Sequence, residues 1–139
     1  MFKHILIPTD LTDRAELAIK MTKTLISGRP TRVTILHVIQ TVNTATFDEL
    51  RDFYLELEKR SASRLDTLRH QLTDAGIDTE QAVLYGKPAL EITRFAQTHD
   101  VDLIALASHP LDPSGPPQDW GTLSYKIGML STCPVLLVK

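Results

Sequence analysis

The chain lacks the features that mark secreted, membrane-spanning and nucleic-acid-binding proteins. It has one cysteine, Cys133, so no internal disulfide can form and an intracellular location is expected. Its 15 Lys and Arg against 17 Asp and Glu give a net charge of −2, which indicates no basic surface for nucleic acid. No apolar run approaches the roughly 20 residues that span a bilayer, and the N-terminus does not read as a signal peptide. We therefore expect a cytoplasmic protein with no nucleic-acid or membrane partner.

What the sequence does contain is a regular alternation of two kinds of apolar segment, in 139 residues that suit one domain. Short runs rich in branched residues predict buried strands at 3–7, 32–39, 79–85, 103–107 and 135–138. Apolar residues at helical spacing predict helices that begin near Asp13, Phe47, Pro88 and Thr122. This alternation predicts an α/β fold with a mostly parallel sheet and helices on both faces.

Two helix ends carry recognisable signals. Asp13, with Glu16 three residues later, predicts a side-chain cap and its reciprocal partner at the start of the first helix. Gly76 followed by Ile77 predicts a left-handed cap at the end of the second. The strand at 79–85 is the most polar of the set, so we expect it near a sheet edge.

The stretch from Val101 to Leu123 is where a ligand site is expected. An apolar run ends at Ser108-His109, a proline-rich loop follows, and Gly121-Thr122 begins a helix. A strand, a polar loop and a helix start, in that order, are how α/β proteins build sites for small ligands. Asp10 follows the first strand in the same way.

Seven short motifs lie in a characteristic order along the whole chain. They are Lys3 to Asp10, Leu36-His37-Val38, Gly86-Lys87-Pro88, Asp102-Leu103-Ile104, Ser108-His109, Gly121-Thr122 and Cys133-Pro134-Val135-Leu136. In order and spacing they resemble the universal stress protein family over residues 1–139, as one universal stress protein domain. The resemblance implies an open twisted parallel five-stranded sheet of order 3-2-1-4-5, like that of the adenine-nucleotide alpha-hydrolases, and a homodimer.

That strand order would make the first and fourth strands neighbours whose connections leave in opposite directions. Ligands bind at such switch points, beyond the carboxyl ends of the strands. By resemblance to nucleotide-binding relatives, Asp10 would contact adenosine, and Pro8, Thr9 and Val38 would line the base site. Asp10 could equally do no more than cap the turn before the first helix, so both roles stay open.

The phosphate side of the resemblance is incomplete. Relatives that bind ATP resemble a Gly-x-x-Gly pattern followed by Gly-Ser or Gly-Thr, whose backbone amides approach the phosphates. Here Ala107 and Pro110 stand at the two glycine positions, and proline has no amide hydrogen. We therefore expect AMP or ATP to bind weakly at most. The candidate cofactor-binding residues are Pro8, Thr9, Asp10, Val38, Ala107, Ser108, Gly115, Gly121, Thr122 and Leu123.

Catalytic and metal chemistry are not indicated. Adjacent Ser108 and His109 do not readily form a nucleophile–base pair, and no Gly-x-Ser-x-Gly motif is present. Neither His37 nor His109 has a second ligand at metal spacing. A receiver domain would need paired acids after the first strand, where Asp10 stands alone. We expect no catalytic residues, no metal and no efficient enzyme, with slow ATP hydrolysis left open.

Two functions therefore stay open. The first is a stress-response regulatory protein that acts as a homodimer on an unknown regulatory protein partner, with a diverged nucleotide site. The alternative is an adenine-nucleotide (AMP or ATP) binding module with at most slow hydrolysis. Because Val135–Val138 is a short apolar strand expected at the sheet edge, we expect the homodimer to form through it.

Overall fold

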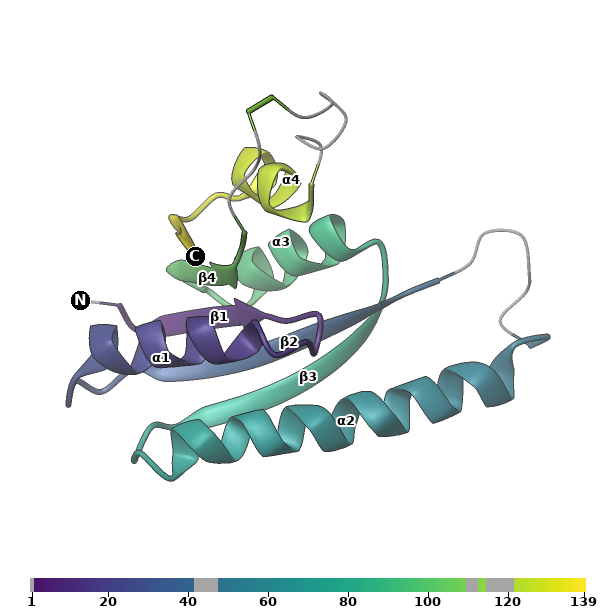
Figure 1. The fold of residues 1–139 in the computed structure, drawn as a ribbon, viewed down its shortest axis with the longest axis horizontal. Helices are drawn as coiled ribbons and strands as arrows, with labels where there is room; N and C mark the ends of the chain where they lie inside the picture. The colour runs from purple at the N-terminus through teal and green to yellow at the C-terminus, as the bar shows by residue number, and fades with distance from the viewer. Residues whose placement is uncertain (1, 42–47, 110–112, 115–121) are drawn as a thin grey trace.

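A computed structural model of this chain describes residues 2–41, 48–109, 113–114 and 122–139. In chain order its elements are β1 (His4–Pro8), α1 (Ala15–Ile26), β2 (Arg32–Gln40), α2 (Arg51–Thr73), β3 (Thr79–Gly86), α3 (Pro88–Thr98), β4 (Leu103–Ala107), α4 (Leu123–Leu130) and β5 (Val135–Val138). The strands form one parallel sheet of order β3-β2-β1-β4-β5 (Figure 1). The predicted fold class and strand order are confirmed. In the described part of the chain, no helix has the length and apolar character to cross a membrane.

The sheet separates two apolar layers, because successive side chains of a strand point to opposite faces. Ile5 and Ile7 of β1 pack with residues of α1 and α2, such as Ile19 and Leu65. Leu6, between them, packs on the other face with Ile127 of α4 and with residues of α3. All of these side chains are fully buried, and each such burial contributes about 1.5–3 kcal/mol. Figure 1 shows α1 and α2 on one side of the strands and α3 and α4 on the other.

Polar contacts fix the amino ends of β1 and β4 against each other. The Asp102 carboxylate accepts hydrogen bonds from the backbone amides of Lys3 at 2.8 Å and His4 at 3.0 Å. The buried His4 ring lies with Nδ1 3.0 Å from the His99 carbonyl oxygen and Nε2 2.8 Å from Thr34 Oγ1. Because a carbonyl only accepts, Nδ1 donates there and Nε2 accepts from the Thr34 hydroxyl. These contacts set the register with which both strands reach the opposite end of the sheet.

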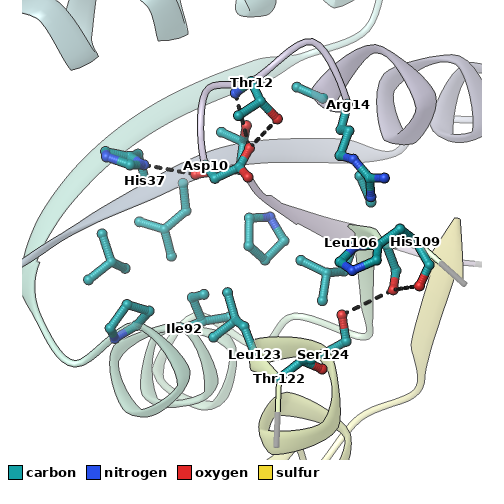
Figure 2. A pocket seen from close by; sticks show the side chains of 18 of the residues that line it. Asp10, Thr12, Arg14, His37, Ile92, Leu106, His109, Thr122, Leu123 and Ser124 are labelled. Atoms are coloured by element: carbon teal, nitrogen blue, oxygen red, sulfur yellow. Dashed lines mark hydrogen bonds between the residues drawn. The ribbon is translucent and has the colours of Figure 1, made fainter. Parts of the chain in front are cut away.

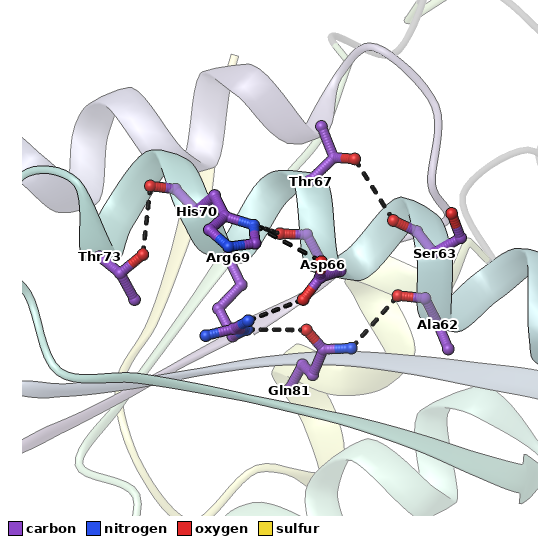
Figure 3. Close-up of polar contacts among 8 residues, drawn as sticks. All are labelled: Ala62, Ser63, Asp66, Thr67, Arg69, His70, Thr73 and Gln81. Carbon is purple, nitrogen blue, oxygen red and sulfur yellow. Dashed lines mark hydrogen bonds and ion pairs between the residues drawn. The ribbon is translucent and has the colours of Figure 1, made fainter.

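The long helix α2 is fixed over the edge strand β3 by a side-chain network (Figure 3). Arg69 donates to Gln81 Oε1 at 3.0 Å and to the Asp66 carboxylate at 2.7 Å. The Gln81 amide donates in turn to the Ala62 carbonyl at 3.2 Å. The hydrogen bond from Arg69 holds the pKa of Asp66 below its ordinary value. The prediction that the most polar strand lies at the sheet edge is confirmed, and its glutamine serves this contact.

The predicted side-chain cap of α1 is wrong. The N-cap residue is Arg14, whose side chain makes no capping bond, and the first amides of the helix donate to backbone carbonyls instead, as the Glu16 amide does to Asp13 at 3.2 Å. Asp13 faces solvent with its Oδ1 3.6 Å from an Arg64 nitrogen, and Glu16 Oε1 accepts from the Gln71 amide at 2.9 Å. Glu16 thus contacts α2, which packs beside α1, while Asp13 is a solvent-exposed residue near Arg64 of α2, and local spacing gives no sign of these partners.

The left-handed cap predicted after α2 is confirmed. Gly76 has φ +80°, a conformation that residues with a Cβ rarely adopt. It lets the Ile77 amide turn back to the Leu72 carbonyl at 3.1 Å, while its own amide bonds to Thr73.

Candidate functional site

A cavity of about 610 Å³ opens at the carboxyl ends of β1 and β4, where the strand order reverses (Figure 2). A volume of this size suits a small organic ligand. Most of the candidate residues line it: Pro8, Thr9, Asp10, Val38, Ala107, Ser108, Thr122 and Leu123. The other two candidates, Gly115 and Gly121, lie outside the described residues. The sheet thus brings together residues that are far apart in the sequence.

Asp10 stabilises the turn between β1 and α1. Its Oδ1 accepts from the Thr12 amide at 3.0 Å and from the Thr12 hydroxyl at 2.6 Å (Figure 2). Partial burial raises the pKa of Asp10, but the Thr12 bonds and the Arg14 charge outweigh it, so the pKa lies below its ordinary value. The structure therefore shows the capping role, and the cavity is lined by an ionised carboxylate that can only accept hydrogen bonds.

Thr9 is tied to its surroundings by every polar group it has. Its amide donates to the Leu36 carbonyl at 2.9 Å, and its carbonyl accepts from His37 Nδ1 at 2.8 Å. Its hydroxyl accepts from the amide of Leu11, which has φ +67°. A left-handed residue other than glycine costs about 1 kcal/mol, so these bonds must outweigh that cost. They fix the direction in which the chain leaves β1 past Asp10.

The opposite wall comes from the end of β4 and the start of α4. The Ser108 amide donates to the Val138 carbonyl at 2.8 Å, and the Ser124 hydroxyl donates to Ser108 Oγ at 3.3 Å. Thr122 is the N-cap of α4, and its Oγ1 accepts from the Tyr125 amide at 3.4 Å. The predicted helix start at Thr122 is confirmed. The cavity therefore borders a helix N-terminus, which carries a partial positive charge.

The cavity has an apolar part and a polar part. The apolar lining includes Leu36, Val38, Pro88, Ile92 and Leu106. The polar lining includes Arg14, Ser108, His109, Thr122 and Ser124. Figure 2 shows Arg14, His109 and Ser124, together with Leu106, on the side of the cavity away from Ile92. Six of these residues were not among the candidates predicted from the sequence: Arg14, Leu36, Pro88, Ile92, Leu106 and Ser124. Arg14 had one usable signal, since it follows Asp10 by four residues at a helix start.

The contacts seen here do not build a nucleophile with its base. The Ser108 hydroxyl lies 3.5 Å from the backbone carbonyl of His109, not from its ring. His37 uses Nδ1 for a backbone contact. In the described parts of the chain, no group of three or more His, Cys, Asp or Glu is placed to hold a metal ion. The arrangement suits binding through charge, hydrogen bonds and apolar contact.

A parallel sheet of this order with a cavity at its switch point defines a Rossmann-like α/β domain. The model of the universal stress protein family matches residues 1–139, and the chain belongs to that family. A universal stress protein of Thermus aquaticus is 31% identical and YxiE of Bacillus subtilis 29%, each with both chains fully covered. The solved structure of protein MJ0577, from Methanocaldococcus jannaschii, is 26% identical with TM-score 0.84, over 100% of this chain and 96% of its own.

Three more distant structures share the fold and are complexes with nucleotides. One universal stress protein in complex with cAMP has TM-score 0.74 at 15% identity, over 99% of this chain and 97% of its own. An Archaeoglobus fulgidus protein in complex with dAMP has TM-score 0.68 at 17% identity, over 99% of this chain and 98% of its own. An Arabidopsis thaliana protein with AMP bound has TM-score 0.71 at 15% identity, over 99% of this chain and 91% of its own.

Proposed function

We propose that this chain is an adenine-nucleotide-binding regulatory domain that holds a nucleoside monophosphate such as AMP in the cavity at the ends of β1 and β4. The observation that carries this proposal is the two-part lining of that cavity at the switch point of the sheet. The solved relatives with cAMP, dAMP and AMP support it, because each combines this fold with one adenine nucleotide.

The apolar part of the cavity suits the base. Val38 and Ile92 are buried side chains from β2 and α3, and Pro8, the last residue of β1, also lines the cavity. A flat base between such side chains removes apolar surface from water. The Asp10 carboxylate would accept a hydrogen bond from the adenine amino group or a ribose hydroxyl while Oδ1 still caps the turn.

In our proposal, the chain acts by binding a nucleotide and not by efficient catalysis. A nucleotidase of high rate needs an activated nucleophile or a metal to stabilise the developing charge. The serine hydroxyls in this cavity contact each other and a backbone carbonyl. A bound nucleotide would instead shift the domain between free and liganded states that a regulatory protein partner could distinguish.

Calorimetric titration of AMP tests the proposal, with two variants that add the same charge in different places. Leu123 lines the cavity and is 37% exposed, and Leu55 lies on α2 and is 49% exposed. Leu123→Glu places a carboxylate beside the ligand phosphate and should weaken AMP binding at least about tenfold. Leu55→Glu should bind AMP like the wild-type chain. Absence of AMP binding by the wild type, or equal binding by all three, would overturn the proposal.

We also propose a homodimer through the edge strand β5. Leu137 on this strand is 39% exposed, and Met129 on the adjoining α4 is 69% exposed. Tyr125 and Leu130 add further exposed apolar surface on the same helix. A second copy of β5 would cover both the apolar side chains and the unpaired backbone groups of the edge.

A further inference from the structure

We propose that Arg14 binds the phosphate of the nucleotide, so that one side-chain charge replaces the backbone amides that a glycine-rich loop would supply. The inference rests on the proposed function, since it concerns the same cavity. It makes the site specific for a monophosphate.

The need for such a group follows from the sequence. Ala107 and Pro110 stand where a phosphate-binding loop would have glycines, and Pro110 has no amide hydrogen to donate. A strong donor outside this loop would therefore strengthen the binding of a phosphate in the cavity. A guanidinium is well suited, because its planar N–H groups match two phosphate oxygens at once.

Arg14 lies where that donor is needed. As the N-cap residue of α1 it follows the Asp10 turn, and Figure 2 shows its side chain reaching toward the end of β4, where His109 lies. Within the described residues, no carboxylate lies within salt-bridge distance of its guanidinium, and the neighbouring Asp13 carboxylate lies 3.6 Å from an Arg64 nitrogen. The guanidinium is exposed and does not need to break an ion pair there before it can bind an anion.

The charges around the cavity limit how much phosphate it can hold. Arg14 is the only Lys or Arg among the described lining residues, while Asp10 and Asp13 both contribute carboxylates. The Arg14 charge already acts on Asp10, where it helps to lower the pKa of that carboxyl. One guanidinium offsets part of the charge of a monophosphate in such surroundings, and a smaller share of the larger charge of a triphosphate.

Uncharged groups complete the polar part. Ser124 and Thr122 line the cavity at the N-terminus of α4, whose partial positive charge favours an anion. The Ser124 hydroxyl donates to Ser108 at a long 3.3 Å, so turning that proton to a phosphate oxygen gives up a weak bond. These hydroxyls would position the phosphate, and Arg14 would supply the charge.

The test is calorimetric titration of adenosine, AMP and ATP, without added metal, into the wild type and three variants. Arg14→Ala should raise the Kd for AMP by about 10- to 100-fold and leave the Kd for adenosine unchanged, as expected for a lost charged hydrogen bond. Arg14→Lys should retain part of the preference for AMP over adenosine. Arg29→Ala is the matched control, because Arg29 is an exposed arginine just beyond the other end of the same helix. It should match the wild type.

The outcomes separate this inference from the proposed function. If the wild type binds adenosine as tightly as AMP, or if Arg14→Ala binds AMP like the wild type, the role of Arg14 is overturned while the nucleotide site stands. If ATP binds more tightly than AMP, the monophosphate preference is overturned. If the wild type binds none of the three, both proposals fail. Because the Arg14 side chain makes no capping bond, Arg14→Ala should melt at the temperature of the wild type, which excludes loss of fold as the cause.

Discussion

One carboxylate oxygen of Asp10 accepts two hydrogen bonds from Thr12, at 3.0 Å from the amide and at 2.6 Å from the hydroxyl. Both bonds hold the turn that carries the chain from β1 into α1. The same residue lines the cavity in which we place the nucleotide. Asp10 therefore has a structural role in this turn and a ligand role that we propose, and the two roles can be separated by mutation.

Thr12→Val removes the shorter bond and leaves the Asp10 carboxylate in place. We expect it to lower the free energy of unfolding by about 1 kcal/mol, as for one hydrogen bond to a charged group at an exposed site, with AMP affinity nearly unchanged. Asp10→Ala should lower both quantities. Urea denaturation measures the free energy of unfolding of both variants, and calorimetry measures their AMP affinity. A loss of AMP affinity in Thr12→Val equal to that in Asp10→Ala would show that the turn, not the carboxylate, matters for binding.

Asp10 should also contribute to the pH dependence of stability. Its pKa in the folded chain is below the ordinary value of 3.8, so the folded state favours the ionised form. The stabilisation is complete above the unfolded pKa and is lost as the pH falls through the lower folded pKa. The difference in unfolding free energy between wild type and Asp10→Asn should therefore be constant near neutral pH and shrink below pH 3.8. A difference that is unchanged at acid pH would contradict this assignment.

The buried contact between His4 and Thr34 makes a prediction about the other end of the sheet. Thr34→Val keeps the shape of the side chain but leaves His4 Nε2 without its donor at 2.8 Å. An unsatisfied buried acceptor costs about 1–3 kcal/mol, which urea denaturation would show as a lower midpoint. Thr24→Val on the exposed face of α1 is the matched control and should change stability far less. Equal effects of the two changes would argue against the His4 contact.

Two glycines should respond to alanine with opposite sign. Gly86 has φ +143°, and a Cβ there would lie 2.8 Å from Glu91 Cγ, so Gly86→Ala should destabilise the chain by about 1–3 kcal/mol. Gly128 lies inside α4 with nothing within 4 Å of an added Cβ. Gly128→Ala should stabilise by about 0.5–1 kcal/mol. The same denaturation experiment measures both, and a loss of stability in Gly128→Ala would contradict the account of α4.

The proposed dimer is tested by light scattering after size-exclusion chromatography. The wild type should elute with the mass of two chains. Leu137→Asp places a charge on the β5 edge and should give monomers, while Leu55→Asp on α2 should leave the dimer intact. A monomeric wild type, or a Leu137→Asp protein that is still dimeric, would rule out this interface.

The fold could be read from the sequence because its signals are local and repeated. The apolar residues at 5–7 and 103–107 are consecutive, as is typical of strands buried on both faces, and Gly76 marks a helix end by its own conformation. The strand order came from a resemblance to a family rather than from these patterns. Once the strand order was given, it was sufficient to place Asp10 and Ser108 at one cavity.

Local sequence patterns could not predict the side-chain partners that depend on tertiary packing. The spacing of Asp13 and Glu16 predicts a helix cap, but in the structure Asp13 Oδ1 lies 3.6 Å from a nitrogen of Arg64 on another helix. Arg14 reaches the cavity because the chain leaves β1 through the left-handed Leu11, a residue type that gives no warning of this conformation. Side-chain direction after such a turn follows from tertiary contacts, so this part of the site needed the structure.

Binding of a nucleotide at the switch point can be located residue by residue in the amide nitrogen–proton NMR spectrum of the wild type during addition of AMP. We expect the largest shifts on residues such as Asp10, Arg14 and Ser108, at the carboxyl ends of β1 and β4. Residues at the opposite end of the sheet, such as Asp78 and Asp100, line a second cavity and serve as the internal control. Shifts concentrated there, or no shifts at saturating AMP, would contradict the account.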